Sequence, residues 1–179
     1  IRDSRIDAAN TYFVVGSGIE ITGNTTDYVS TTLATACMGP FDLGAASGCR
    51  VTGNRVNILS TVAADTVNGA YGFILGSGGN VIADNYINVE STRPDVFGLY
   101  VGGSGAPSGT NEIVGNTIRV GTNGTPSDSV LVRIVRQSTT GPADLLLQRN
   151  TFSTSKTSGA WATEYSVYAT HTGSPAAMT

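Results

Sequence analysis

The sequence predicts an all-β fold, and three observations support this prediction. Asparagine recurs at intervals of 30, 31, 31 and 34 residues, at Asn24, Asn54, Asn85, Asn116 and Asn150. A repeat of this period is typical of a chain that stacks one structural unit on the next. Of the 179 residues, 23 are glycine and only 13% are charged. Thr, Val, Ile, Ser, Asn and Gly dominate, and this composition favours strands and turns over helices.

The first element of each repeat is an apolar strand whose centre lies 10 to 17 residues before the asparagine. These strands are predicted at Phe13–Val15, Phe41–Leu43, Phe73–Leu75, Leu99–Val101 and Val132–Ile134. A glycine follows each of the first four strands, and short Gly/Ser-rich connections lead on to the asparagine turn.

The residues around each asparagine predict further strands with one buried face. The residues three positions before it are all apolar: Ile21, Val51, Ile82, Ile113 and Leu147. Two and four positions after it the residues are again mostly apolar, and in segments such as Val56-Asn57-Ile58 they alternate with polar residues. This period-two alternation is the pattern of a half-buried strand. We therefore expect these rows to form the core.

The repeats predict a coil, because no segment is long enough for a helix that crosses over a flat parallel sheet. We expect a right-handed parallel β-helix of about five to six rungs over residues 1–155. Residues 156–179 are expected to add a terminal strand or cap and then a loose tail that begins at His171. Because Ile1–Ile6 already matches the pattern, with Ser4 in the asparagine position, we expect a fragment of a longer coil.

The asparagine row is predicted to be structural. Asparagine tolerates the left-handed backbone of a tight corner, a preceding glycine tolerates it better, and stacked amides can hydrogen-bond along the coil. A period near 31 residues is longer than a minimal rung, so loops are expected to bulge at 30–39, 61–70, 91–96, 104–110 and 121–128. Binding surfaces tend to occupy such loops.

These apolar-x-Gly-Asn-x-apolar repeats over residues 1–155 resemble the pectate-lyase-like right-handed parallel β-helix superfamily. The Ser/Thr/Gly/Asn-rich composition is most similar to that of bacteriophage tailspikes and surface-polysaccharide depolymerases. The resemblance implies a homotrimer that binds bacterial surface polysaccharide, located on the virion (phage tail) or extracellular. The fold carries lyases, hydrolases, adhesins and inert spikes, so it leaves the activity open.

Composition excludes several other classes of partner. A net charge of −3 and no basic stripe argue against a nucleic-acid partner. No apolar run reaches the roughly 20 residues that a membrane helix needs, so we expect no membrane insertion. The single His171 and the scattered acidic residues predict no metal site and no cofactor. Cys37 and Cys49 are expected to be buried free thiols.

Three outward-facing rows follow from the repeat. In the strand before the glycines the row is Val14, Asp42, Ile74, Tyr100 and Arg133. Four positions before each asparagine stand Glu20, Arg50, Val81, Glu112 and Leu146. Three positions after it stand Asp27, Asn57, Asn88, Arg119 and Ser153. Apolar residues such as Val81 and Leu146 on an outer face suggest packing against another subunit.

The candidate catalytic residues come from two neighbouring repeats. Alignment of the segment from Asp95 to Tyr100 with the segment from Asp128 to Arg133 places Asp95 above Asp128, about one strand spacing of roughly 5 Å apart. Two carboxyl groups at that distance suit a retaining glycosidase, and one of them should then be protonated as the general acid. In the alternative interpretation, both aspartates start strands and bond to local backbone.

The candidate substrate-binding residues lie around this pair and on a second surface. Arg93, Tyr100 and Arg133 are candidates to bind sugar hydroxyls or a uronate carboxylate. Tyr86, beside Arg55, is a candidate to stack on a sugar ring, although an isolated aromatic side chain more often packs against a loop.

The sequence therefore predicts a tailspike-like receptor-binding protein that recognises bacterial surface polysaccharide. If the protein is an enzyme, a glycoside hydrolase is favoured over a lyase, because no acidic cluster for Ca²⁺ stands beside a basic residue. A non-catalytic spike or adhesin stalk and a polysaccharide lyase remain the alternatives.

Overall fold

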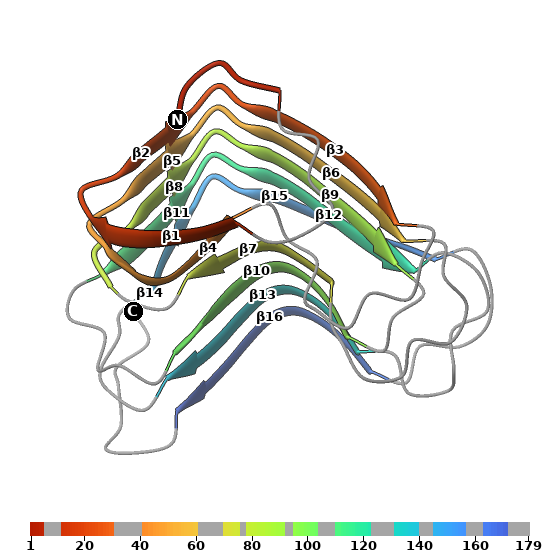
Figure 1. Ribbon diagram of the computed structural model, residues 1–179. Helices are drawn as coiled ribbons and strands as arrows, with labels where there is room; N and C mark the ends of the chain where they lie inside the picture. Colours follow the sequence, from red (N-terminus) through yellow and green to blue (C-terminus); the bar gives the residue numbers. More distant parts are fainter. Residues whose placement is uncertain are drawn as a thin grey trace.

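Three parallel sheets form the fold of the residues that the structure describes (Figure 1). The structure, a computed structural model, describes residues 1–5, 12–30, 41–60, 70–75, 78–91, 95–103, 110–122, 131–139, 145–156 and 163–171. Along the chain a strand of one sheet is followed by a strand of the second and then of the third, and the cycle repeats. The prediction of an all-β chain with parallel strand stacking is confirmed.

Each sheet collects the equivalent strands of successive repeats. Sheet I contains β2 (Glu20–Thr22), β5 (Arg50–Thr52), β8 (Val81–Ala83), β11 (Asn111–Val114) and β14 (Leu145–Gln148). Sheet II contains β3 (Thr25–Ser30), β6 (Arg55–Ser60), β9 (Tyr86–Ser91), β12 (Thr117–Thr122) and β15 (Thr151–Lys156). Sheet III contains β1 (Tyr12–Ser17), β4 (Phe41–Ser47), β7 (Ala70–Leu75), β10 (Asp95–Gly103), β13 (Leu131–Thr139) and β16 (Thr163–His171). Sheets I and II meet along a ridge, and sheet III lies across the other side of the core (Figure 1).

The ridge is the corner that contains the recurring asparagine. The left-handed backbone belongs to the residue before each asparagine, with φ of 66° at Gly23, 63° at Gly53 and 68° at Gly115. The same position holds Asp84 at 55° and Arg149 at 53°, although side chains disfavour this conformation. Each sharp turn leads directly from a sheet I strand into a sheet II strand.

The asparagine side chains form a continuous ladder inside this ridge. Asn85 Oδ1 accepts hydrogen bonds from the backbone N of Asn54 at 2.9 Å and from its Nδ2 at 2.9 Å. Asn85 Nδ2 donates to Asn116 Oδ1 at 2.9 Å and to the carbonyl of Val51 at 2.8 Å. The same bonds link Asn24 to Asn54 and Asn116 to Asn150. The predicted structural role of the row is confirmed.

A second, shorter ladder lies at the corner between sheets III and I. Asn80 Oδ1 accepts from the backbone N of Cys49 at 3.0 Å, and Asn111 Oδ1 accepts from the N and Nδ2 of Asn80, both at 3.1 Å. These three residues are fully buried. This ladder was not predicted, although Asn80 and Asn111 each stand five positions before a ridge asparagine. Cys49 is a buried free thiol, as predicted, and Cys37 lies outside the described residues.

The core contains the predicted apolar rows of sheets I and II together with apolar residues of sheet III. Ile21, Val51, Ile82 and Ile113 in sheet I are fully buried, and Leu147 packs against the same cluster. Sheet II contributes the residues two and four positions after the asparagine, such as Val56, Ile58, Ile87, Val89, Ile118 and Val120. Sheet III contributes Phe73, Val96, Phe97 and Leu99. Core residues therefore alternate with outward-facing residues along the strands of sheets I and II.

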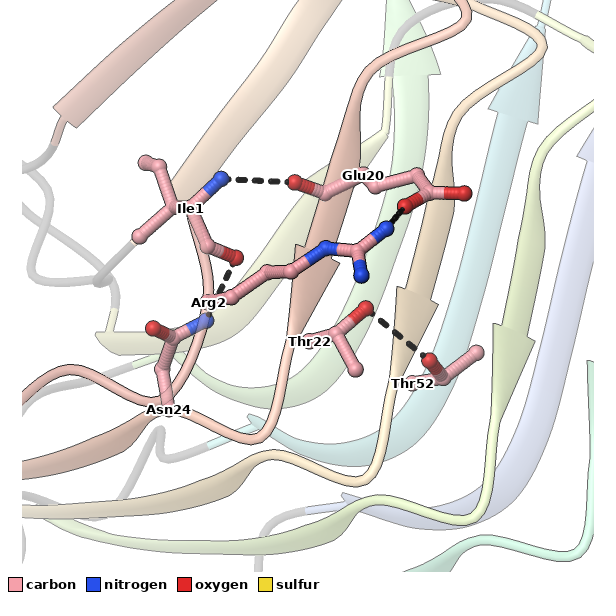
Figure 2. Close-up of polar contacts among 6 residues, drawn as sticks. All are labelled: Ile1, Arg2, Glu20, Thr22, Asn24 and Thr52. Atoms are coloured by element: carbon pink, nitrogen blue, oxygen red, sulfur yellow. Dashed lines mark hydrogen bonds and ion pairs between the residues drawn. The ribbon is translucent and has the colours of Figure 1, made fainter.

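The first residues of the chain continue the ladder (Figure 2). Arg2 and Arg5 pair with Thr22 and Thr25, and the backbone N of Ser4 donates to Asn24 Oδ1 at 3.1 Å. Asn24 Nδ2 donates to the carbonyl of Ile1 at 3.2 Å, and Arg2 forms an ion pair with Glu20. Ser4 thus occupies the asparagine position, as the sequence predicts.

At the other end, β16 pairs in parallel with β13 and adds a strand to sheet III. His171, expected in a loose tail, is instead the last residue of β16 and pairs with Thr139. Residues 172–179 and most of the predicted loops lie outside the described residues. The loop ranges were drawn too wide, since Ser30, Ser91 and Asp95 belong to strands.

Replacing Asn85 by leucine should lower the free energy of unfolding by at least about 2 kcal/mol, because the buried N–H of Asn54 and the carbonyl of Val51 lose their partners. The matched control is Asn88→Leu on the outer face, where one side-chain hydrogen bond is lost and the expected cost is below about 1 kcal/mol. Chemical denaturation measures both values. Equal costs for the two variants would contradict the structural role of the ladder.

Replacing Asp84 by glycine should raise the free energy of unfolding by about 0.5–1 kcal/mol, since glycine adopts the left-handed backbone without steric cost. Asp84→Ala keeps a Cβ at the same φ and should give no gain. Thermal unfolding of both variants tests the prediction, and a lower melting temperature for Asp84→Gly than for the parent chain would count against it.

Candidate binding face

The outer face of sheet II contains the candidate functional side chains. In β9 buried residues alternate with half-buried ones, and its Tyr86, Asn88 and Glu90 belong to the outward-facing set. The strand on each side contributes residues at paired positions, namely Arg55 and Asn57 from β6 and Arg119 from β12. We call these six residues the binding face. They are held on a stiff support, because the alternate residues of the same strands are in the core.

Arg55 and Tyr86 form the aromatic part of the binding face. They occupy paired positions in β6 and β9, and the guanidinium carbon of Arg55 lies 4.7 Å from the centroid of the Tyr86 ring. This distance is typical of a cation–π contact. The structure therefore brings together the two residues that the sequence analysis selected for this surface.

Two amides lie beside this pair. Asn88 Nδ2 donates to Asn57 Oδ1 at 2.7 Å across paired positions. Asp27 occupies the next position beyond Asn57, and Arg119 occupies the next position beyond Asn88. Asn88 Oδ1 is buried and has no hydrogen-bond partner in the structure. The bond between the two amides fixes their orientation on this part of the face.

Glu90 and Arg119 complete the face with a loose ion pair. The distance from the Arg119 guanidinium to Glu90 Oε1 is 3.6 Å, and the two side chains are 46% and 25% exposed. An ion pair this open to solvent contributes little stability. Both groups are therefore available for bonds to a ligand.

This arrangement combines a tyrosine ring with amide, guanidinium and carboxylate groups. The polar groups can both donate and accept hydrogen bonds, as sugar hydroxyls require. An aromatic ring beside such groups offers an apolar surface for the C–H face of a sugar. Asn57, Asn88 and Arg119 were predicted on an outward row but not as site residues, and Glu90 was not predicted. The continuation of the same alternation to the fifth position after the asparagine could have identified Glu90.

The alignment behind the candidate catalytic pair is wrong by three residues. Asp95 pairs with Leu131 in the register of β10 and β13, and Asp128 lies outside the described residues. The register matches the buried Leu99 with the apolar Val135, and the connection that leads into β13 is longer than the one that leads into β10. The premise that Asp95 lies directly above Asp128 therefore fails, and the catalytic role of either residue stays a prediction.

The same shift separates two candidate binding residues. Tyr100 pairs with Arg136 and Arg133 pairs with Phe97, so Tyr100 and Arg133 do not occupy the paired positions that were predicted. Arg93 lies outside the described residues. Only Arg55 and Tyr86 among the predicted site residues are shown in contact.

The described residues contain no group of three or more His, Cys, Asp or Glu side chains arranged to hold a metal ion. Within the same part of the chain, no helix is long and apolar enough to cross a membrane.

In comparisons with known proteins, no family model, curated protein or solved structure matches the chain.

The contact between Arg55 and Tyr86 should contribute a coupling free energy of about 0.5–1 kcal/mol at this exposed site. A double-mutant cycle with Arg55→Ala, Tyr86→Leu and the combined variant, followed by chemical denaturation, measures it. Additive effects of the two single variants would show that the ring and the guanidinium do not interact in solution.

Proposed function

We propose that the chain forms a right-handed parallel β-helix of about five to six rungs, of the pectate-lyase-like kind. The handedness is supported by the path of the chain between neighbouring strands of sheet III. From β1 to β4, for example, it passes through β2 and β3 before it returns parallel to β1. Connections between parallel strands of one sheet are right-handed in about 98% of cases.

We propose further that the binding face recognises a bacterial surface polysaccharide, as a tailspike-like protein on a virion or outside the cell would do. The observation that carries this proposal is the Tyr86 ring next to Arg55, with amides and an ion pair on the adjoining positions. Sugars are bound by such combinations of an aromatic surface and planar hydrogen-bonding groups. A flat sheet face also suits a long, extended ligand better than a compact one.

The proposed activity is recognition of the polysaccharide. Whether the chain also cleaves it is tested by assaying the bound glycan for cleavage products. A hydrolase would release reducing ends from the polysaccharide, and a lyase would release unsaturated products. A chain that serves only as a stalk would neither bind nor cleave. Each of these outcomes is measurable on the same glycan.

Tyr86→Ala should weaken binding to a polysaccharide found on a glycan array by at least about tenfold, since the ring supplies the main apolar contact. Titration calorimetry with that polysaccharide measures the change. The matched control is Gln148→Ala, an exposed polar residue of sheet I, which should bind as the parent chain does.

Unfolding curves of both variants should show that the fold is intact, because Tyr86 is only half-buried. If the parent chain bound no bacterial polysaccharide, the stalk would become the better interpretation. If Tyr86→Ala bound as well as the parent chain, the ligand would have to occupy another surface.

A further inference from the structure

The outer face of sheet I contains a charge pattern that the binding face does not use. Along the stack, the residues four positions before each asparagine are Glu20, Arg50, Val81, Glu112 and Leu146, and strand pairing confirms this predicted row. The residues two positions later on the same face are Thr22, Thr52, Ala83, Val114 and Gln148. We call these two rows the pairing face.

Two opposite charges of the pairing face stand on either side of its central strand. Val81 and Ala83 lie on the middle strand β8, with Arg50 one strand away on β5 and Glu112 one strand away on the opposite side, on β11. Arg50 and Glu112 are exposed, and neither has an ion-pair partner among the described residues. Glu20, by contrast, is already paired with Arg2 (Figure 2). A cation and an anion therefore stand unpaired at equal distances from an apolar centre.

We propose that the pairing face binds the same face of a second copy of this chain, related by a two-fold axis that runs parallel to β8. Such an axis keeps the strand direction and reverses the order of the strands. Val81 then meets Val81 of the partner subunit, and Ala83 likewise meets its equivalent. Arg50 of each copy faces Glu112 of the other, so one rotation creates two ion pairs around an apolar contact.

The geometry of packed sheets is compatible with these contacts. Two sheets that pack face to face lie about 10 Å apart, a gap that a pair of small apolar side chains fills and that an arginine and a glutamate can span. The Asp84 carboxylates would lie at the margin, where the chain turns away into sheet II and where water and salt screen their repulsion. An isologous contact of this kind is the commonest way in which two identical chains associate.

The charges do not match in the same way if the repeats of the two copies are stacked in the same direction. If both stacks ran in the same direction, each strand would meet its own equivalent. Arg50 and Glu112 are separated by β8 and would not meet. The charge pattern therefore favours a dimer in which the repeats of the two copies are stacked in opposite directions, and not the homotrimer that the family resemblance implies.

The contact area must be small, because the strands of sheet I contain only three or four residues. Stable dimers usually bury about 800 Å² on each partner, so we expect weak association that depends on concentration. The ion pairs then serve mainly to set the orientation of the two copies.

Analytical ultracentrifugation of the full chain tests the proposal by charge reversal. Arg50→Glu and Glu112→Arg should each raise the dissociation constant of the dimer by at least about tenfold, because like charges then face each other twice. The double variant with both changes restores the complementarity, and its dissociation constant should lie within about threefold of the parent value. Asp27→Arg is the matched control, since it reverses the charge of an exposed residue on sheet II, as Glu112→Arg does on sheet I, and should leave association unchanged.

The restored association of the double variant is the decisive observation, since mere damage to the fold would be additive. A parent chain that is monomeric at every accessible concentration would overturn the proposal. A trimer, or a dimer unaffected by the single reversals, would also overturn it, as would a double variant that fails to associate.

Discussion

The structure depends on one hydrogen-bonding unit, the buried asparagine amide at the ridge. Its oxygen accepts from the backbone and the side chain of one neighbouring repeat, while its nitrogen donates to the amide of the other neighbour and to a carbonyl. Aspartate lacks the donor, and serine is too short to reach both neighbours. Ser4 illustrates the difference, since it is joined to Asn24 only through its backbone N–H. Because the unit sits inside the corner, each repeat is locked to the next at the place where the chain turns most sharply.

The hydrogen bonds between the ridge asparagines also determine which side chains lie on the surface. Once the ridge asparagines are aligned, alternation along the strands fixes which residues of sheets I and II face water. Residues of different repeats are thereby set side by side at the strand spacing, as Arg55 and Tyr86 are. The binding face and the pairing face lie on the two sheets that meet at the ridge, so neither surface obstructs the other. A chain associated through sheet I would still expose sheet II.

Much of this arrangement could be predicted from the sequence near the ridge and little of it farther away. Close to each asparagine the spacing is constant, so the rows that contain Glu20, Asp27 and the core isoleucines were assigned correctly. The connections that lead into sheet III differ in length, and the alignment of the two segments that follow them missed the true partner of Asp95 by three residues. Register there follows the packing of apolar residues such as Leu99, which a single sequence does not reveal. The contact of Arg55 with Tyr86 was accessible because both residues directly follow a ridge asparagine.

The direction of the amide ladder has a further consequence. The amide-to-amide bonds between successive ridge asparagines all run the same way, from a side-chain nitrogen of the earlier repeat to a side-chain oxygen of the later one. All internal junctions are therefore chemically equivalent, and a whole repeat brings with it both halves of the bonds that it needs. Duplication or loss of one repeat would leave the remaining junctions unchanged, whereas a change of a few residues can be absorbed only in the connections around sheet III. The fold can thus lengthen or shorten in evolution by complete repeats, while its surfaces diversify residue by residue.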